Sequence, residues 1–471
     1  MRTENYIGGK WVASDSKLNV FNPANGLKIA EVSSASATVV EQALQSAQVA
    51  FNEYSQFSIE KRQELIQQLV DKLKEQADPI IELLILETGK TKEVASYDYG
   101  MLLEALPFFI EEVKRNYGET IPDYTGDHIN IISHHPVGVV AGLLTWNFPL
   151  LNLAYKLGPA LATGCSVVFK ASHHTPLSSL LVAEVIDSIG FPKGTVNILT
   201  GDPKLVSDTL AESKIPRLLT AIGSTFAGKK LVEKSASSIK RFSLELGGDA
   251  PVIVFEDADL DNAVETIVSL KMANAGQICV APNRVYIHDS IYDKFIQKSV
   301  DFVKKYRMLG DSGGGPELSP LVDEASVIRL ENICSSEIHK GSVVVGGKRV
   351  KREGYFFEPT IVKDLSFDTS LVCEELFGPV IPVFSFSNSD DIYSMANDTE
   401  YGLSAYLFTQ SLSRALEAEK RLLFGNILIN TVHYSIQLPH GGLKQSGFGK
   451  EQINHFKFKG KQNYEREKIL K

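Results

Sequence analysis

The chain has 471 residues, 44% of them hydrophobic and 22% charged, which is an ordinary composition for a globular protein. Because a single hydrophobic core stops growing at about 250–300 residues, a chain of this length predicts two large lobes. The 48 Lys and Arg against 57 Asp and Glu give a formal net charge of −9, which argues against nucleic acid or an anionic membrane surface as the main partner.

The four cysteines, Cys165, Cys279, Cys334 and Cys373, are scattered along the chain. They form no CxxC pair and show no Cys/His ligand spacing, so we expect neither a disulfide framework nor a bound metal. The first residues lack the apolar segment of a signal peptide, and no run of about 18 apolar residues occurs. These features predict a cytoplasmic protein with reduced thiols.

The first half of the chain predicts short strands, then a long helical stretch, then strands alternating with helices. The helical stretch covers 38–117, where Val40, Ala43, Leu44, Ala47 and Phe51 mark one apolar stripe. Strands are expected within 6–32 and at 137–144, 166–170, 196–199 and 217–222, and helices at 150–162, 204–211 and 223–238. This alternation predicts a parallel sheet with helices on both faces.

A helix is also expected after Thr175, which would be its N-cap, with Pro176 in the first turn. A second alternating region then follows. Its expected strands lie at 251–255, 284–287, 381–386 and 427–429, and its expected helix at 261–274. The pattern predicts an α/β fold of two lobes that join near Leu246-Gly247-Gly248.

Cys279 lies just beyond Gly276, on an expected loop between the lobes. A thiol in such a place is exposed enough to react. The alternative is simple packing, because free cysteine is among the most buried residue types. Taken alone, this cysteine does not decide between the two.

Glu245 lies between Leu244 and Leu246 in an apolar strand. Burial there would raise the pKa of its carboxyl group, which suits a general base near neutral pH. Alternatively, backbone amides or a nearby lysine such as Lys240 satisfy the carboxylate. The sequence leaves both readings open.

Three further polar positions follow expected strands, at the edge where open parallel sheets bind ligands. Asn147 could donate its amide to a developing oxyanion, or simply form a turn. Lys170 could meet a ribose or phosphate, or extend to solvent. Gly223-Ser224 opens a helix whose free N–H groups suit a pyrophosphate, although the segment is not a G-x-G-x-x-G fingerprint.

In this order along the chain, these residues resemble the aldehyde dehydrogenase superfamily over nearly the whole length. The most specific segments are LELGG at 244–248, GQIC at 276–279 and EELFGP at 374–379. Supporting segments are IGGKW at 7–11, FNPA at 21–24, FFEPT at 356–360 and GGLKQSGFG at 441–449.

The resemblance implies a role for each matching residue. Cys279 is expected to be the nucleophile, Glu245 the base, and Asn147 with the Cys279 backbone N–H the oxyanion hole. Cofactor contacts are expected from Leu144, Trp146, Lys170, His173, Gly223, Ser224, Leu246, Glu375 and Phe377. The mouth of the substrate pocket is expected at Phe148, Tyr155 and Ile278, and Glu451 resembles a position in the proton-relay path of some relatives.

The implied reaction oxidises an aldehyde to its carboxylic acid with NAD or NADP. The Cys279 thiolate attacks the carbonyl carbon, hydride leaves for the nicotinamide, and water activated by Glu245 hydrolyses the resulting thioester. A rival is a CoA-acylating enzyme, whose members generally lack the base at the position of Glu245. A second rival is a binding or structural protein that has lost catalysis, which would have lost Cys279, Glu245 or Asn147.

The resemblance also implies a domain plan. Residues 1–117 and 136–246 would form a Rossmann-like cofactor domain, and residues 247–445 a second α/β catalytic domain. Residues 118–135 and 446–471 would form a small β extension that makes a homodimer or homotetramer.

Two departures from the family pattern bear on specificity. Many members carry an acid where this chain has His173, and that acid holds the adenine ribose hydroxyls. A histidine does not repel a 2′-phosphate, so NADP is expected to be accepted, and a preference for NADP over NAD is the further hypothesis. Tyr155 and Ala273 stand where succinate-semialdehyde dehydrogenases carry arginines for the substrate carboxylate. We therefore expect an uncharged aliphatic or aromatic aldehyde, with a cationic one as second choice.

Overall fold

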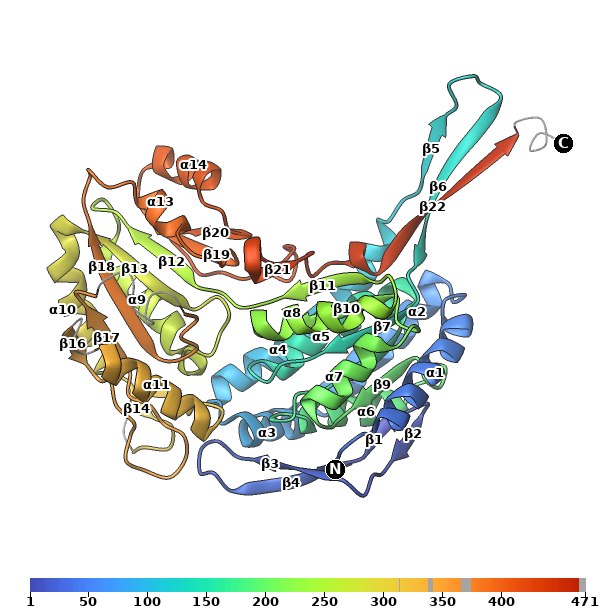
Figure 1. Cartoon of the computed structure of the whole chain (residues 1–471), viewed down its shortest axis with the longest axis horizontal. Helices are drawn as coiled ribbons and strands as arrows, with labels where there is room; N and C mark the ends of the chain where they lie inside the picture. The colour runs from blue at the N-terminus through green and yellow to red at the C-terminus, as the bar shows by residue number, and fades with distance from the viewer. Residues whose placement is uncertain (313, 338–341, 366–373, 466–471) are drawn as a thin grey trace.

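Two large sheets and a three-stranded sheet organise the chain in the computed structural model (Figure 1). Two further sheets have two strands each, β3 (Lys17–Phe21) with β4 (Lys28–Ser33) and β14 (Arg307–Met308) with β15 (Glu317–Leu318). The structure describes residues 1–312, 314–337, 342–365 and 374–465. It confirms the predicted α/β class, with alternating strands and helices in both lobes.

The first sheet has eight strands in the order β2-β1-β9-β8-β7-β10-β11-β21. The five strands from β9 to β11 run parallel, and β1, β2 and β21 pair antiparallel at the edges. The strands are β1 (Asn5–Ile7), β2 (Lys10–Val12), β7 (Val139–Leu143), β8 (Ser166–Lys170), β9 (Val196–Leu199), β10 (Leu218–Ile222), β11 (Arg241–Glu245) and β21 (Gly447–Phe448).

Helices cover both faces of this sheet. They are α1 (Ala37–Tyr54), α2 (Ile59–Glu75), α3 (Ala77–Thr88), α4 (Lys92–Lys114), α5 (Pro149–Thr163), α6 (Leu177–Asp187), α7 (Pro203–Glu212) and α8 (Thr225–Lys234). Successive side chains of a strand point to opposite faces, so Val140 joins one core while Val139 and Ala141 join the other. Two-sided burial explains why β7 is apolar throughout.

The predicted cap of helix α6 was wrong. Pro176 occupies the N-cap position, and its side chain has no group that can accept a hydrogen bond. Glu87 of α3 caps the helix instead, because its carboxylate accepts the backbone N–H groups of Leu177 at 2.7 Å and Ser178 at 3.0 Å. A carboxylate 90 residues away cannot be found by reading the local sequence around a helix start.

The second sheet has seven strands in the order β16-β17-β18-β13-β12-β19-β20, with only β16 antiparallel to its neighbour among the described strands. Its strands are β12 (Ala250–Val254), β13 (Pro282–His288), β16 (Ser342–Val345), β17 (Thr360–Lys363), β18 (Val380–Phe386), β19 (Ser404–Phe408) and β20 (Asn426–Ile429). Its helices are α9 (Leu260–Met272), α10 (Tyr292–Val303), α11 (Glu324–Glu337), α13 (Ile392–Asn397) and α14 (Leu412–Arg421). The two sheets separate between Glu245, which ends β11, and Ala250, which begins β12.

Asp249 lies in this crossing. Its buried carboxylate pairs with the buried guanidinium of Arg284 at 2.8 Å. Asn283 and Thr399 donate to the same carboxylate at 2.9 and 3.2 Å. Asp249 therefore has a structural explanation, since it neutralises a cation at the start of the second lobe.

A three-stranded sheet, β22-β6-β5, projects from the first lobe (Figure 1). It combines β5 (Glu119–Pro122), β6 (His128–Pro136) and β22 (Lys457–Glu465). Residues 447–448, expected in this extension, instead form β21 at the edge of the first sheet, and residues 466–471 lie outside the described part. The domain limits and the role of the extension in assembly stay predictions.

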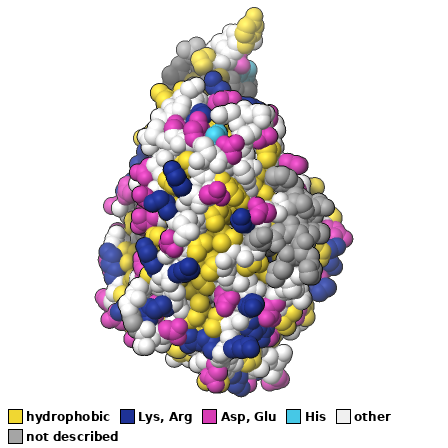
Figure 2. All heavy atoms as spheres, turned by 90° about the vertical axis from the view of Figure 1, so that its left-hand side faces the viewer, with side chains coloured by type: hydrophobic (Ala, Val, Ile, Leu, Met, Phe, Trp, Pro, Cys, Tyr) yellow, Lys and Arg dark blue, Asp and Glu magenta, His cyan; other side chains and the backbone are white. Residues whose placement is uncertain are grey.

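The surface over the second lobe carries basic and acidic side chains side by side, flanking an apolar band (Figure 2). Such mixing agrees with the moderate net charge of −9. Among the described residues, no helix is long and apolar enough to cross a membrane. The cytoplasmic location stays a prediction.

Candidate active site

The three residues predicted to carry the chemistry come from different parts of the chain and meet at one place. Asn147 follows β7, Glu245 ends β11, and Cys279 lies on the loop between α9 and β13. Asn147, Glu245 and Cys279 line the same two cavities. The first two stand at the C-terminal edge of the parallel sheet, where open α/β sheets bind ligands.

Cys279 and Glu245 lie within 4.8 Å of each other, measured between the sulfur and a carboxylate oxygen. Glu245 is only 3% exposed, whereas Cys279 is partly exposed. Burial, then the negative charge of Glu245 and the contact with its carboxylate, raise the pKa of Cys279 well above the usual thiol range. The thiol therefore needs a base or a nearby positive charge to ionise at neutral pH.

A strained turn presents Cys279 to the cavities. Asn274, Ala275 and Gly276 have φ of 47°, 53° and 73°, so three consecutive residues adopt the left-handed region. For Asn274 and Ala275 this conformation costs about 1–2 kcal/mol each. Gln277 stabilises the turn, because its side-chain amide donates to Asn274 O and Pro320 O and accepts from Val322 N–H.

Two glycines let other backbones approach this loop closely. A Cβ on Gly276 would lie 2.2 Å from the carbonyl oxygen of Gly378, and one on Gly248 would lie 2.1 Å from that of Cys279. Both distances are far inside contact range, so any side chain would push the loop away. Gly248 therefore lets the Cys279 loop pack on the crossing between the two sheets, and Gly276 lets it pack on the segment before β18.

The side chain of Asn147 is fixed at both ends. Its Nδ2 donates to Gln277 O at 3.1 Å, and its Oδ1 accepts from Asn152 Nδ2 at 3.3 Å. Asn274 Nδ2 also donates to the carbonyl oxygen of Asn147 at 3.1 Å. An amide nitrogen carries two hydrogens, so one N–H of Asn147 remains to serve an oxyanion beside Cys279. Asn152 and Gln277 were not predicted, because their role lies in contacts across the fold.

Cys279 stands where two cavities meet. The smaller cavity, of about 290 Å³, brings together five of the predicted cofactor positions. These are Trp146, Gly223, Ser224, Glu375 and Phe377. Arg329 and Ser326 also line it and were not predicted.

Glu375 is held beside the smaller cavity by the Gly248 N–H, which donates to its carboxylate at 2.9 Å. Burial raises the pKa of Glu375 to about 8, so at neutral pH this carboxyl group is mostly protonated. The rings of Trp146 and Phe377 meet edge to face at 5.5 Å. The rings of Trp146 and Phe377 and the mostly protonated Glu375 side chain thus form one wall of the smaller cavity.

The other predicted cofactor positions lie outside the lining of the smaller cavity. Burial lowers the pKa of Lys170, at the end of β8, to about 8. Burial, and then the charges of His174 and Lys170, lower the pKa of His173 to about 4, so its imidazole is neutral at pH 7. Leu144 and Leu246 are buried, and their N–H groups donate to Lys170 O and Ser446 O.

The larger cavity, of about 790 Å³, lies on the other side of Cys279. Phe148, Tyr155 and Ile278 line it, as predicted for a substrate pocket. Further lining residues that the sequence did not single out include Glu93, Tyr97, Glu104, Tyr434 and His440. Tyr97 and the two glutamates come from α4, a helix whose sequence carries no motif that would mark them.

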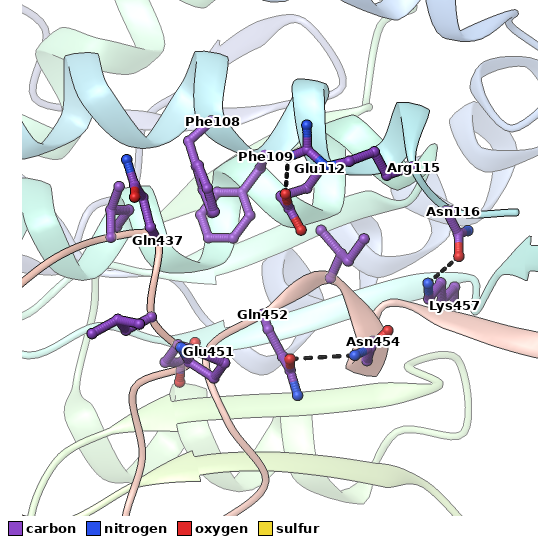
Figure 3. A pocket seen from close by; sticks show the side chains of 14 residues that line it. Phe108, Phe109, Glu112, Arg115, Asn116, Gln437, Glu451, Gln452, Asn454 and Lys457 are labelled. Atoms are coloured by element: carbon purple, nitrogen blue, oxygen red, sulfur yellow. Dashed lines mark hydrogen bonds and ion pairs between the residues drawn. The ribbon is translucent and has the colours of Figure 1, made fainter. Parts of the chain in front are cut away.

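Glu451 does not line either of the two cavities that Cys279 borders. Its buried carboxylate pairs with the buried ammonium of Lys156, and its backbone N–H donates to His440 O at 2.6 Å. Glu451 also lines a separate cavity between α4 and the segment that follows β20 (Figure 3). Its part in proton transfer stays a prediction.

Comparison with known proteins identifies this arrangement. The sequence model of the aldehyde dehydrogenase family matches residues 11–459. The chain belongs to the aldehyde dehydrogenase family. The resemblance inferred from the motifs is thereby confirmed, and with it an oxidoreductase of the aldehyde dehydrogenase class that uses NAD or NADP.

Several relatives are similar to this aldehyde dehydrogenase over nearly their whole length. An NADP⁺-dependent succinate-semialdehyde dehydrogenase of Escherichia coli is 38% identical over 96% of this chain and 94% of its own. A glutarate-semialdehyde dehydrogenase of Pseudomonas aeruginosa is also 38% identical over the same shares. The solved structure of a betaine aldehyde dehydrogenase of Staphylococcus aureus with NAD⁺ has a TM-score of 0.94 and 33% identity, covering 99% of this chain and 98% of that one.

The raised pKa of Cys279 predicts how its reactivity depends on pH. In the enzyme without cofactor, the rate of alkylation by iodoacetamide should rise with pH and level off only above the usual thiol pKa of about 8.5. In Glu245→Gln the inflection should move to lower pH, because a negative charge next to the thiolate is gone. Mass spectrometry of the Cys279 peptide measures the rates.

Glu104→Gln is the matched control, since Glu104 lines the larger cavity but is not among the groups that shift the pKa of Cys279. Its inflection should equal that of the wild type. An unchanged inflection in Glu245→Gln would contradict the electrostatic coupling.

Proposed function

We propose that this aldehyde dehydrogenase oxidises an aldehyde to its carboxylic acid through a covalent intermediate on Cys279. The proposal rests on one observation: Cys279, Glu245 and Asn147 converge where the two cavities meet. A thiol at that junction can hold a substrate carbonyl from one cavity while a cofactor reaches it from the other.

In the first step, the sulfur of Cys279 forms a bond with the carbonyl carbon of the aldehyde. The thiol proton passes to the Glu245 carboxylate, which lies within 4.8 Å of the sulfur. The carbonyl oxygen becomes an oxyanion and accepts the remaining amide N–H of Asn147. Because Asn152 and the Gln277 carbonyl fix the Asn147 amide beforehand, little reorganisation is needed as charge develops.

A nicotinamide cofactor bound in the smaller cavity would supply the acceptor for the hydride that leaves the former aldehyde carbon. The smaller cavity fits such a group, because it combines polar backbone at the start of α8 with the rings of Trp146 and Phe377. Ser224 and the free N–H groups of that helix start suit a pyrophosphate. Glu375, mostly uncharged at neutral pH, can donate a hydrogen bond to a ribose hydroxyl.

In the last step, Glu245 takes a proton from a water molecule that attacks the thioester carbon. Before this, solvent in the larger cavity removes the proton that Glu245 gained from the thiol. The carbon–sulfur bond breaks, and the sulfur leaves as the thiolate while the carboxylic acid departs. The presence of Glu245 beside Cys279 favours hydrolysis over transfer of the acyl group to CoA.

The lining of the larger cavity supports an uncharged or cationic aldehyde over one with a carboxylate. Tyr97, Phe148, Tyr155 and Tyr434 supply aromatic faces, and among the described residues that line the cavity there is no lysine or arginine. The two glutamates on α4 add negative charge at exposed positions. A substrate carboxylate would lose its hydration there without gaining a positive partner. In this respect the chain differs from what the names of its semialdehyde relatives suggest.

The proposed reaction is tested with purified protein, NAD or NADP, and three aldehydes. We expect benzaldehyde and a cationic aminoaldehyde to give a kcat/KM at least about tenfold above that of succinate semialdehyde, since an unpaired buried carboxylate costs more than 1.4 kcal/mol. Formation of the reduced cofactor is followed by its absorbance. A clear preference for succinate semialdehyde would refute the substrate class but leave the reaction class standing.

The reaction class itself is tested by Cys279→Ala, which should abolish turnover with every aldehyde. Cys334→Ala is the matched control, because Cys334 is a free thiol in the core of the second lobe, away from both cavities. It should keep wild-type turnover. Near-wild-type activity in Cys279→Ala would exclude the proposed nucleophile.

We also propose that the enzyme accepts NADP because of His173. A neutral imidazole neither repels a 2′-phosphate nor pairs with it, and Lys170 nearby supplies positive charge. This supports use of NADP without deciding that it is preferred over NAD.

His173→Glu should therefore raise the KM for NADP by about tenfold or more, because the new carboxylate repels the 2′-phosphate. The KM for NAD should stay equal or fall. Steady-state kinetics with each nucleotide at saturating aldehyde measures the change, with His173→Gln as the uncharged control. Equal effects of Glu and Gln on NADP would show that charge at this position does not select the nucleotide.

A further inference from the structure

We propose that Cys279, Glu245 and His440 form a binding site for one zinc ion, which blocks the nucleophile reversibly. His440 follows β20 in the chain and belongs to none of the positions that carry the proposed reaction. Its imidazole nevertheless faces Glu245, with Nε2 at 3.7 Å from Oε1. One ligand atom from each of the three residues lies within 4.8 Å of the others.

The spacing of these atoms is close to what zinc requires. With Zn–N and Zn–O bonds of about 2.0–2.2 Å and a Zn–S bond of about 2.3 Å, tetrahedral ligands are about 3.3–3.8 Å apart. The His440–Glu245 pair already has such a separation. The sulfur has to move by about 1 Å or less, and Cys279 borders open space in both cavities.

The surroundings of Glu245 and His440 also suit a bound cation. Glu245 Oε1 is buried and accepts no hydrogen bond from the described residues. The His440 side chain is 12% exposed, and its ring is held between Tyr155, stacked at 6.0 Å and 18°, and Tyr434, edge-on at 5.8 Å. A buried carboxylate oxygen that accepts no hydrogen bond costs free energy, and here an imidazole ring is also fixed towards it. A ligand bound between the oxygen and the ring would offset this cost.

The charges around the cluster also favour a dication. The Glu245 carboxylate lies within 4.8 Å of the Cys279 sulfur and of His440, so the cluster contains an acidic group to pair with a cation. Lys156, which belongs to the neighbouring helix α5, is engaged in its buried pair with Glu451. A zinc ion would offset this negative potential, and coordination would displace the thiol proton to solvent.

A zinc ion at this place would occupy the sulfur lone pair that attacks the aldehyde. The fourth zinc position would be open to water in the larger cavity, as in sites that are not closed structural centres. We expect inhibition that a chelator reverses. This site departs from the expectation, based on Cys and His spacing, that the protein binds no metal, because its ligands are 34 and 161 residues apart in the chain.

The site is tested first by calorimetric titration of the cofactor-free enzyme with zinc chloride. We expect one ion per chain, and an affinity at least about tenfold lower in His440→Phe. His433→Phe is the matched control, since His433 lies on the same segment and lines the same cavity but is not part of the cluster. It should bind zinc as the wild type does. Equal affinity in wild type and His440→Phe would overturn the proposal.

A second measurement identifies the sulfur ligand. Cobalt(II) bound by a thiolate gives a charge-transfer band in the near ultraviolet, which we expect in the wild type and not in Cys279→Ser. Persistence of the band in Cys279→Ser would overturn the assignment. Cooperative thermal unfolding of each variant checks the fold, and His440→Gln replaces His440→Phe if the latter does not fold.

The two measurements need no turnover, so they stand apart from the proposed reaction. Only the inhibitory effect rests on the proposed role of Cys279. Zinc that binds as expected without slowing aldehyde oxidation would refute the blocking role and, with it, Cys279 as the nucleophile. Zinc that fails to bind would refute this site and leave the reaction unaffected.

Discussion

The close approach of two backbones at Gly248 is the constraint on which this site depends. The carbonyl oxygen of Cys279 lies only 2.1 Å from where a Cβ of Gly248 would be, so the loop of the second lobe packs directly on the crossing from the first. That contact brings the Cys279 thiol of the second lobe close to the Glu245 carboxylate at the sheet edge of the first lobe. The strained turn at Asn274 and Ala275 is retained because the packing against Gly378 and the Gln277 hydrogen bonds fix it.

Three glutamates lie near this contact, of which Glu245 and Glu451 are buried and Glu375 is half-buried, and their surroundings give each a different task. Glu451 is paired with Lys156 and stays out of the cavities that Cys279 borders. Glu375 accepts a backbone N–H, and burial still raises its pKa to about 8. Glu245 has one oxygen without a hydrogen bond from the described residues, directed at His440 and close to Cys279. The carboxylate with the fewest partners is the one placed to exchange protons.

The sequence predicted the alternating elements of the first lobe well, because strands buried on both faces, such as Val139–Leu143, are continuous apolar runs. Family motifs then placed Cys279, Glu245 and Asn147, whose convergence the structure shows. What could not be predicted depends on contacts between distant segments. The Glu87 cap of α6, the Asp249–Arg284 pair and the approach of His440 to Glu245 each join residues at least 35 positions apart. Local patterns carry no signal for such pairs.

The central claim is that the acyl group is bound to Cys279 and that Glu245 brings about its release. Trapping the acyl group on Cys279 tests this claim most directly. Glu245→Gln is mixed with benzaldehyde and oxidised cofactor, quenched in acid, digested and analysed by mass spectrometry. The account predicts a benzoyl group on the Cys279 peptide that hydroxylamine removes, with far less in the wild type, where hydrolysis is fast. Steady formation of benzoic acid by the variant, without any acyl group on Cys279, would contradict it.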